Sequence, residues 1–348
     1  MNNQVSYRTV TTLDRLARPL TSLRLSVTDR CNLRCHYCMP EAEYTWLPRE
    51  DILDFEETTR LARVFASAGA TRLRLTGGEP LLRRELPVLV AQLSAAVEWH
   101  DLALTTNGIL LAPLADALKA AGLQRITVSL DTLDPARFKA LTRSDELSRV
   151  REGLDHAARV FPGFKIDAVV MRGVNEDEVE ALVREAARLG AELRFIEYMD
   201  VGGATRWTPE QVFSRRDLLA SLTRSFGAPA PLRDDRWAPA ARFRLPHGQV
   251  IGVISSTTEP FCATCDRSRL TADGMWYRCL YATTGTDLRA RIRAGATDAE
   301  LRQVVTDSWQ ARADQGAEDR LRMADRQAFV SVTSLKRDSH LEMHTRGG

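Results

Sequence analysis

The hydrophobic and polar positions of the chain predict a repeated strand–helix order. Short alternating or continuous apolar runs are typical of strands, and apolar residues every three or four positions are typical of helices. Strands are predicted at residues 21–28, 71–76, 102–106, 125–130, 165–170 and 192–199. Helices are predicted between them, at residues 55–70, 83–97, 111–122, 147–160 and 176–190.

This order favours an α/β fold in which a parallel sheet is covered by helices. Each helical connection is long enough to carry the chain to a parallel neighbouring strand. The six predicted units are too few to close an eight-stranded barrel. An open, partial TIM-like barrel and a doubly wound sheet both fit the periodicity.

The pattern changes after about residue 230. Residues 228–243 are rich in Pro and Arg, which is typical of a linker or a crossing segment. Short strands are predicted beyond it, at residues 248–255 and 328–332, before a polar tail that ends in two glycines. We therefore expect a barrel core at residues 1–230 and a C-terminal extension at residues 231–348.

Composition narrows the possible environments and partners. The formal net charge of the 348 residues is only +2, which argues against nucleic acid as a partner. The chain has no apolar run of 18 residues and no apolar signal-peptide core near its start. These features predict a cytoplasmic protein without a membrane partner, in which thiols stay reduced.

The cysteines form two tight clusters and occur nowhere else in the chain. The first cluster is Cys31, Cys35 and Cys38; the second is Cys262, Cys265 and Cys279. Groups of three thiolates suit an iron–sulfur cluster or zinc, but structural zinc takes four protein ligands. The first cluster has no fourth Cys or His in a zinc pattern, and the second lacks another C-x2-C pair. Each cluster would leave one coordination position for a ligand that is not protein.

The first cluster resembles a known signature. The run CNLRCHYCMP, with Tyr37 before its third cysteine, is similar to that of the radical S-adenosylmethionine (SAM) enzymes. The resemblance implies that Cys31, Cys35 and Cys38 hold a [4Fe–4S] cluster, that SAM binds its open iron, and that SAM cleavage yields a 5′-deoxyadenosyl radical.

Three further positions match SAM-contacting positions of these enzymes. They are Gly78 in the GGEP motif of residues 77–80, Ser129 in VSLD and Met199 in IEYMD. The resemblance makes them, with Tyr37, candidate cofactor-binding residues. Taken singly, the GGEP would be a turn, Ser129 a helix cap or turn residue, and Met199 a packing residue.

The second cluster lies in a longer similarity. Residues 261–281, FCATCDRSRLTADGMWYRCLY, resemble the C-terminal motif of the GTP 3′,8-cyclases, and the similarity runs from about residue 10 to the Gly-Gly end. It implies a second [4Fe–4S] cluster on Cys262, Cys265 and Cys279, whose open iron binds the guanine base of GTP. The reaction implied yields (8S)-3′,8-cyclo-7,8-dihydroguanosine 5′-triphosphate, the first step of molybdenum cofactor biosynthesis.

A triphosphate substrate needs converging cations, for which Arg and Lys are suited. The resemblance offers the cations Arg24, Arg74, Lys165, Arg267 and Arg269, with the hydroxyl residues Thr105 and Ser268. The resemblance makes Arg267 and Arg269 catalytic candidates beside the first three cysteines. Charged residues rarely lie in strands of a parallel sheet without a partner. The alternative for each, strongest for Arg74, is a cation paired with an acid.

The resemblance also implies partners and a role for the tail. These partners are a reductant such as a flavodoxin or ferredoxin and a downstream cyclic pyranopterin monophosphate synthase; the chain itself is expected to be a monomer or homodimer. Gly347 and Gly348 would close on the active site, although Arg346 stands where Ile is more usual. The alternatives are a radical SAM peptide maturase and a non-enzymatic iron–sulfur or zinc protein, but electron carriers usually bind a cluster through four ligands.

Overall fold

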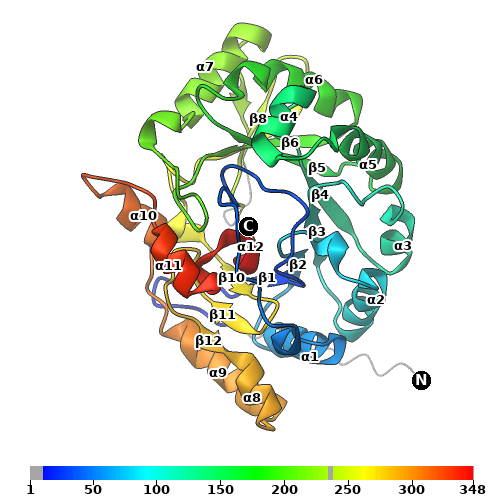
Figure 1. Cartoon of the computed structure of the whole chain (residues 1–348), viewed down its shortest axis with the longest axis vertical. Helices are drawn as coiled ribbons and strands as arrows, with labels where there is room; N and C mark the ends of the chain where they lie inside the picture. Colours follow the sequence, from blue (N-terminus) through cyan, green and yellow to red (C-terminus); the bar gives the residue numbers. More distant parts are fainter. Residues whose placement is uncertain (1–10, 234–237, 348) are drawn as a thin grey trace.

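The computed structural model describes residues 11–233 and 238–347. One curved sheet forms a partial ring with helices around its outside, and the C-terminal end of the chain lies near the middle of the ring (Figure 1). In the described residues the sheet has 12 strands in the order β12-β11-β10-β1-β2-β3-β4-β5-β6-β9-β8-β7. The two end strands do not pair with each other, so the sheet is open.

The six strands predicted for the core are confirmed. They are β1 (Ser22–Ser26), β2 (Arg72–Thr76), β3 (Asp101–Thr106), β4 (Arg125–Ser129), β5 (Lys165–Val170) and β6 (Glu192–Glu197). Each is parallel to the next in chain order. A doubly wound sheet reverses its strand order, and this one does not. The partial barrel is therefore the fitting alternative.

The helices between these strands also match the sequence pattern. They are α1 (Phe55–Ser67), α2 (Leu86–Ala96), α3 (Ala115–Ala120), α5 (Leu147–Val160) and α6 (Val179–Arg188). At the start of α1, the carboxylate of Asp54 accepts from the backbone N–H of Glu57, and Glu57 accepts from that of Asp54. This reciprocal capping satisfies two backbone donors. The helix α4 (Pro135–Thr142) was not predicted.

The C-terminal part of the chain extends the sheet on both sides. On one side β10 (Arg267–Leu270) pairs in parallel with β1, followed by the antiparallel strands β11 (Met275–Tyr277) and β12 (Thr286–Asp287). On the other side β9 (Val250–Ile254) pairs in parallel with β6, followed by the antiparallel β8 (Ala241–Arg244) and β7 (Ala230–Pro231). One sheet thus crosses the expected boundary at residue 230, and the division there stays a prediction about chain organisation.

The strand predicted at 328–332 is wrong. The hydroxyl of Ser331 accepts from the N–H of Ser334 and caps α11 (Val332–Arg337). Phe329 donates its N–H to the carbonyl of Asp200 at 2.7 Å, and its ring packs against Tyr281. The apolar residues are anchored by tertiary contacts and a helix cap, not by strand pairing.

The segment predicted as a linker, residues 228–243, includes parts of two strands. Its ends contribute to β7 and β8, and residues 234–237 of it lie outside the described residues. The remaining helices are α7 (Arg215–Phe226), α8 (Leu288–Arg293), α9 (Asp298–Gln310), α10 (Gly316–Leu321) and α12 (Met343–Arg346). None of the described helices is long and apolar enough to cross a membrane.

The two faces of the sheet differ in character. Apolar residues on the outer face are buried, including Leu23, Leu73, Leu104, Val128, Ile166 and Phe195. Between them, polar and charged residues face inward because side chains alternate along a strand. The hydrophobic core therefore lies between sheet and helices, and the inner face is left for chemistry.

Candidate functional site

Both cysteine clusters line a single cavity on the inner side of the sheet. The cavity has a volume of about 690 Å³, and all six cysteines contribute to its wall. Cys31, Cys35 and Cys38 follow β1, whereas Cys262 and Cys265 precede β10 and Cys279 follows β11. The parallel pairing of β1 with β10 brings together two motifs that lie more than 200 residues apart in the chain.

The first three thiols lie close enough to influence one another. Burial raises the pKa of Cys31 to about 11 and that of Cys38 further. Burial also raises the pKa of Cys35 well above its usual value, and neighbouring Cys31 and Cys38 raise it more. A bound iron would offset this cost because it stabilises thiolate. Three partly buried thiols at a cavity wall thus suit an iron–sulfur cluster.

The GGEP glycines pack on the backbone that leads into the first cysteine. The N–H of Gly78 donates to the carbonyl of Thr28 at 3.0 Å. A Cβ at Gly77 would lie 2.3 Å from the Thr28 carbonyl oxygen, and one at Gly78 would lie 2.3 Å from that of Arg30. Only glycine permits these approaches. The motif therefore supports the cysteine loop, besides lining the cavity.

Glu79 is a site residue that the sequence reasoning did not single out as a side chain. Its buried carboxylate accepts hydrogen bonds from the N–H of Leu81 and Asn107 and from the hydroxyl of Thr106. Burial raises its pKa to about 7, although these bonds oppose the shift. Glu79 thereby ties the GGEP loop to the end of β3.

The other predicted cofactor-binding residues also reach the cavity. Tyr37, Ser129 and Met199 line it, and Tyr37 donates its hydroxyl to Asp131 at 2.8 Å. Asp131 in turn accepts from the N–H of Val169 at 2.8 Å. Asp131 was not predicted, although it ends the VSLD run and fixes Tyr37 in place.

Arginines from three neighbouring strands form a row. In the sheet register Arg24 of β1 lies opposite Arg74 of β2 and Arg269 of β10. Burial lowers the pKa of Arg24 well below its usual range, and the charges of Arg269, Arg267 and Arg74 lower it further. Such mutual repulsion is relieved by an anion, so the row is suited to phosphate.

Thr105 and Lys165 lie on the same face of the sheet as Arg74. Arg74 donates to the hydroxyls of Thr105 and Thr127 at 3.1 Å each. Burial lowers the pKa of Lys165 to about 8, and Arg194 contributes to the shift. The Lys165 Nζ lies 3.6 Å from Glu192 Oε1. A pair with an acid was the alternative interpretation of each cation, and it was expected most of all for Arg74. The structure shows such a pair for Lys165, which also lines the cavity.

Ser268 is placed differently from the arginines beside it. Arg267 and Arg269 line the cavity, but Ser268 is fully buried and is not among the lining residues. The alternation of side chains along β10 turns it to the opposite face. We therefore leave Ser268 out of the proposed substrate contacts.

The second group of thiols has a more cationic setting than the first. Burial would raise the pKa of Cys265, but Arg267 and Arg312 lower it to about 7. Burial raises the pKa of Cys279 to about 11. The Arg267 guanidinium also stacks 4.7 Å from the ring centroid of Phe261. Among residues 11–233 and 238–347, no three Cys, His, Asp or Glu side chains surround the position of one metal ion.

The C-terminal tail packs beside the site, and Met343 and His344 of α12 line the cavity. Arg269 donates to the carbonyls of Arg346 and Gly347. Gly347 has a φ of +67°, and a Cβ there would lie 2.0 Å from the Thr76 hydroxyl, so glycine fits this position. Arg346 is buried, stacked 4.1 Å from the Tyr277 ring centroid and bonded to the Leu280 carbonyl. Gly348 lies outside the described residues.

His344 is a second residue that the sequence did not point to. It lines the cavity and is only 2% exposed, and neither ring nitrogen has a hydrogen-bond partner among the described residues. Burial lowers its pKa to about 3, with a further contribution from Arg34. Its ring packs edge-on against Tyr44 and Trp46. A neutral imidazole at this wall can bond to a molecule in the cavity.

Two family models match the chain. Residues 25–186 match the Radical SAM superfamily, and residues 191–318 match Molybdenum Cofactor Synthesis C.

Curated relatives match along nearly the whole length. GTP 3′,8-cyclase 1 of Mycobacterium tuberculosis (strain H37Rv) is 54% identical over 340 residues, covering 96% of this chain and 95% of that protein. GTP 3′,8-cyclase of Acidothermus cellulolyticus is 48% identical, covering 88% and 87%. GTP 3′,8-cyclase of Staphylococcus aureus (strain Newman) is 38% identical, covering 88% and 92%.

A solved structure shares the fold at low identity. Streptococcus suis SuiB bound to S-adenosylmethionine aligns with a TM-score of 0.59 and 12% identity, covering 88% of this chain and 67% of SuiB.

Proposed function

The chain belongs to the GTP 3′,8-cyclases, a family of radical SAM enzymes, and from this premise we propose that it converts GTP to (8S)-3′,8-cyclo-7,8-dihydroguanosine 5′-triphosphate. This reaction is the first step of molybdenum cofactor biosynthesis. The observation that carries the proposal is the shared cavity, whose wall holds both groups of three cysteines and a cluster of cations. A radical generator and its substrate need to meet within one enclosed space.

The first cysteine group would hold the [4Fe–4S] cluster of the family. Cys31, Cys35 and Cys38 supply three thiolates, and SAM would complete the cluster at its open iron. When bound, cluster and SAM supply the radical that takes the hydrogen from ribose C3′. The protein's own part is support: Gly78 and Glu79 hold the cysteine loop, and Tyr37, Ser129 and Met199 line the space beside it.

The second cysteine group would hold a second [4Fe–4S] cluster. Cys262, Cys265 and Cys279 again supply three thiolates, and its open iron would bind the guanine base of GTP. The cations that lower the pKa of Cys265 suit a thiolate ligand there. Guanine C8 would then lie at the site where the bond to C3′ forms.

The cations that line the cavity would bind the triphosphate. Arg24, Arg74 and Arg267 present guanidinium groups to the cavity, with Lys165 and the Thr105 hydroxyl on the same sheet face. Arg269 holds the tail through the carbonyls of Arg346 and Gly347, and so links phosphate binding to tail position. These contacts would orient the ribose so that C3′ and C8 approach each other.

Replacing Arg267 with alanine is expected to weaken GTP binding by about 1.5–3 kcal/mol, the range for a hydrogen bond to a charged group. Calorimetry under anaerobic conditions, without SAM or reductant, measures this without turnover. Lys139→Ala is the matched control, because Lys139 is an exposed cation paired with Asp145. Equal affinity of Arg267→Ala and the unmodified protein would remove Arg267 from the site.

Cluster counting combined with turnover tests the whole proposal. After anaerobic reconstitution, the protein should hold about eight irons per chain, and about four would exclude the second cluster. With SAM, a reductant and GTP, deoxyadenosine and the cyclised nucleotide should form together. Eight irons without nucleotide turnover would favour the alternative, a radical SAM peptide maturase, because a fold alone does not determine the substrate.

The proposal also covers the partners of the protein, its location and the roles of the two parts of its chain. A flavodoxin or ferredoxin would supply electrons, and a cyclic pyranopterin monophosphate synthase would take the product. The protein would work in the cytoplasm as a monomer or homodimer, with residues 1–230 as its radical SAM core and residues 231–348 as the extension for GTP.

A further inference from the structure

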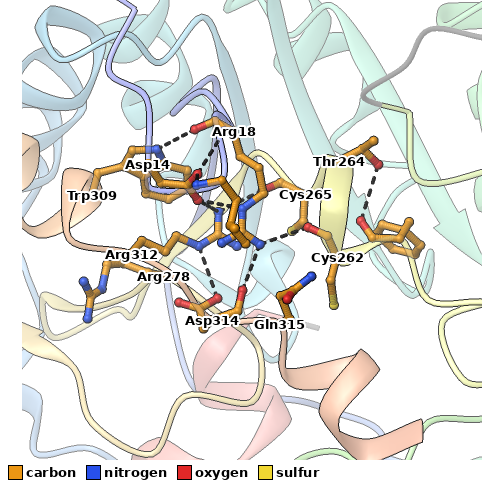
Figure 2. A network of polar contacts seen from close by, with 12 residues as sticks. Asp14, Arg18, Cys262, Thr264, Cys265, Arg278, Trp309, Arg312, Asp314 and Gln315 are labelled. Atoms are coloured by element: carbon orange, nitrogen blue, oxygen red, sulfur yellow. Dashed lines mark hydrogen bonds and ion pairs between the residues drawn. The ribbon is translucent and has the colours of Figure 1, made fainter. Parts of the chain in front are cut away.

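A buried network of charged residues contacts the backbone of Cys262 and Cys265 (Figure 2). It joins the segment near the N-terminus to the segment after α9. Arg18 is fully buried and donates through Nη1 to the carbonyl of Cys262 at 2.9 Å and to that of Asp314 at 2.8 Å. Its Nε donates to Asp14 Oδ2 at 2.6 Å. Arg18 thus binds the backbone carbonyl of Cys262, the first cysteine of the second group.

Arg312 makes the corresponding contact with the next cysteine. It is 2% exposed, and its Nη1 donates to the carbonyl of Cys265 at 2.8 Å. Its Nε lies 3.2 Å from Asp314 Oδ1, and its Nη1 lies 3.6 Å from Asp14 Oδ2. The guanidinium stacks 4.5 Å from the Trp309 ring centroid. The two arginines hold both carbonyls of the C-x2-C turn.

This arrangement costs free energy that ordinary packing would avoid. Arginine is almost never fully buried unless it is paired, and a buried charge pays a large desolvation penalty. Here Asp14 lies near both guanidinium groups, and the Trp309 indole donates to the Arg18 carbonyl at 3.0 Å. Asp14 therefore compensates both buried charges. The two guanidinium groups bind the carbonyls of Cys262 and Cys265, whose thiols are the proposed cluster ligands.

We propose that Arg18 and Arg312 are positioning residues for the iron–sulfur cluster of Cys262, Cys265 and Cys279. The inference rests on the second cluster in the proposed function and adds to it two residues that touch neither substrate nor iron. The two guanidinium groups fix the cysteine backbone before iron arrives, so that the thiols meet the cluster without loop rearrangement. Partners behind metal ligands commonly determine metal affinity in this way.

The same contacts predict an electrostatic effect. A cluster gains one negative charge on reduction, and cations near its sulfurs stabilise the reduced form. Loss of the Arg312 charge would also leave Asp314 without that partner, which increases the negative potential near the cluster. The midpoint potential of the second cluster should therefore fall when Arg312 is made neutral.

The test is made on the full chain with the first cysteine group removed. In Cys31→Ala/Cys35→Ala/Cys38→Ala protein, all bound iron and every cluster spectrum belong to the second group. Two quantities are measured: the rate of iron loss to a chelator, and the midpoint potential by spectroelectrochemistry. The second quantity would not respond to a purely structural role.

Arg312→Gln in this background should lose iron about tenfold faster, within the range for residues that support metal ligands. Its midpoint potential should move to more negative values. Arg312→Lys keeps the charge but not the fork, so it should lose iron faster while its potential stays nearer that of the parent. An unchanged rate or an unchanged potential in Arg312→Gln would overturn the proposal.

Arg289→Gln is the matched control for loss of a supporting arginine. Arg289 donates to the carbonyl of Asp51 at 2.9 Å and pairs with its carboxylate, and these partners are not cysteines. It should change neither quantity; an effect equal to that of Arg312→Gln would also overturn the proposal. If the background protein with native arginines binds no iron, the second cluster itself fails. That result is separate from a failure of the two arginines.

Discussion

Cys35→Ala is expected to abolish SAM cleavage. Cys35 is the middle thiol of the first group, and its pKa is raised by burial and then by Cys31 and Cys38 on either side. With this thiol gone, two ligands remain for a cluster that needs three from the protein, and SAM loses the iron on which it is cleaved. No other cysteine lies near enough in sequence to substitute, because the remaining three belong to the second group.

The measurement is deoxyadenosine formed per chain by anaerobically reconstituted protein with SAM and reductant. We expect the signal to fall to that of protein without iron. Cys279→Ala, treated in the same way, controls for damage from losing a partly buried cysteine. Deoxyadenosine formation retained in Cys35→Ala would refute the assignment of the first cluster.

Cys279→Ala is expected to separate the two halves of the reaction. The substitution leaves Cys31, Cys35 and Cys38 in place, so some deoxyadenosine should still form. The cyclised nucleotide should be absent, because Cys262 and Cys265 alone cannot hold a cluster that presents an open iron to guanine. Both products can be quantified by chromatography of one reaction mixture.

The ratio of the two products is the decisive quantity. In the unmodified protein one cyclised nucleotide should accompany each productive deoxyadenosine. The ratio should fall to near zero in Cys279→Ala while SAM is still consumed. Cyclised nucleotide at the unmodified level would show that the second group has no part in substrate binding.

The barrel core could be predicted from sequence because its signals are local. Strands such as β5 and β6 alternate cleanly, and α6 has a continuous apolar stripe, so each element is visible within its own residues. The strand β10 was not visible. Its residues RSRL carry two arginines and no apolar alternation. They form a strand because they pair with β1 and face a polar cavity, which local sequence does not show.

The residues of the candidate site also differ in whether local sequence could reveal them. Cysteines and glycines at fixed spacing could be found because their chemistry depends on residue type and short separations. Arg18 and Arg312 could not, since they bind backbone carbonyls, which every residue offers. The prediction of a strand at 328–332 was wrong for the opposite reason. It relied on a local apolar run and did not take into account that Ser331 caps a helix.

The pairing of β1 with β10 has a consequence for how the protein is made. The ribosome must add roughly 240 residues after β1 before β10 exists, which at about 5–20 residues per second takes roughly 10–50 s. During that time the nascent chain presents one edge of β1 without its final partner, and exposed edges invite association with other chains. Yield in a foreign host should therefore depend on translation speed and on chaperones that shield this edge until the second cysteine motif has been synthesised.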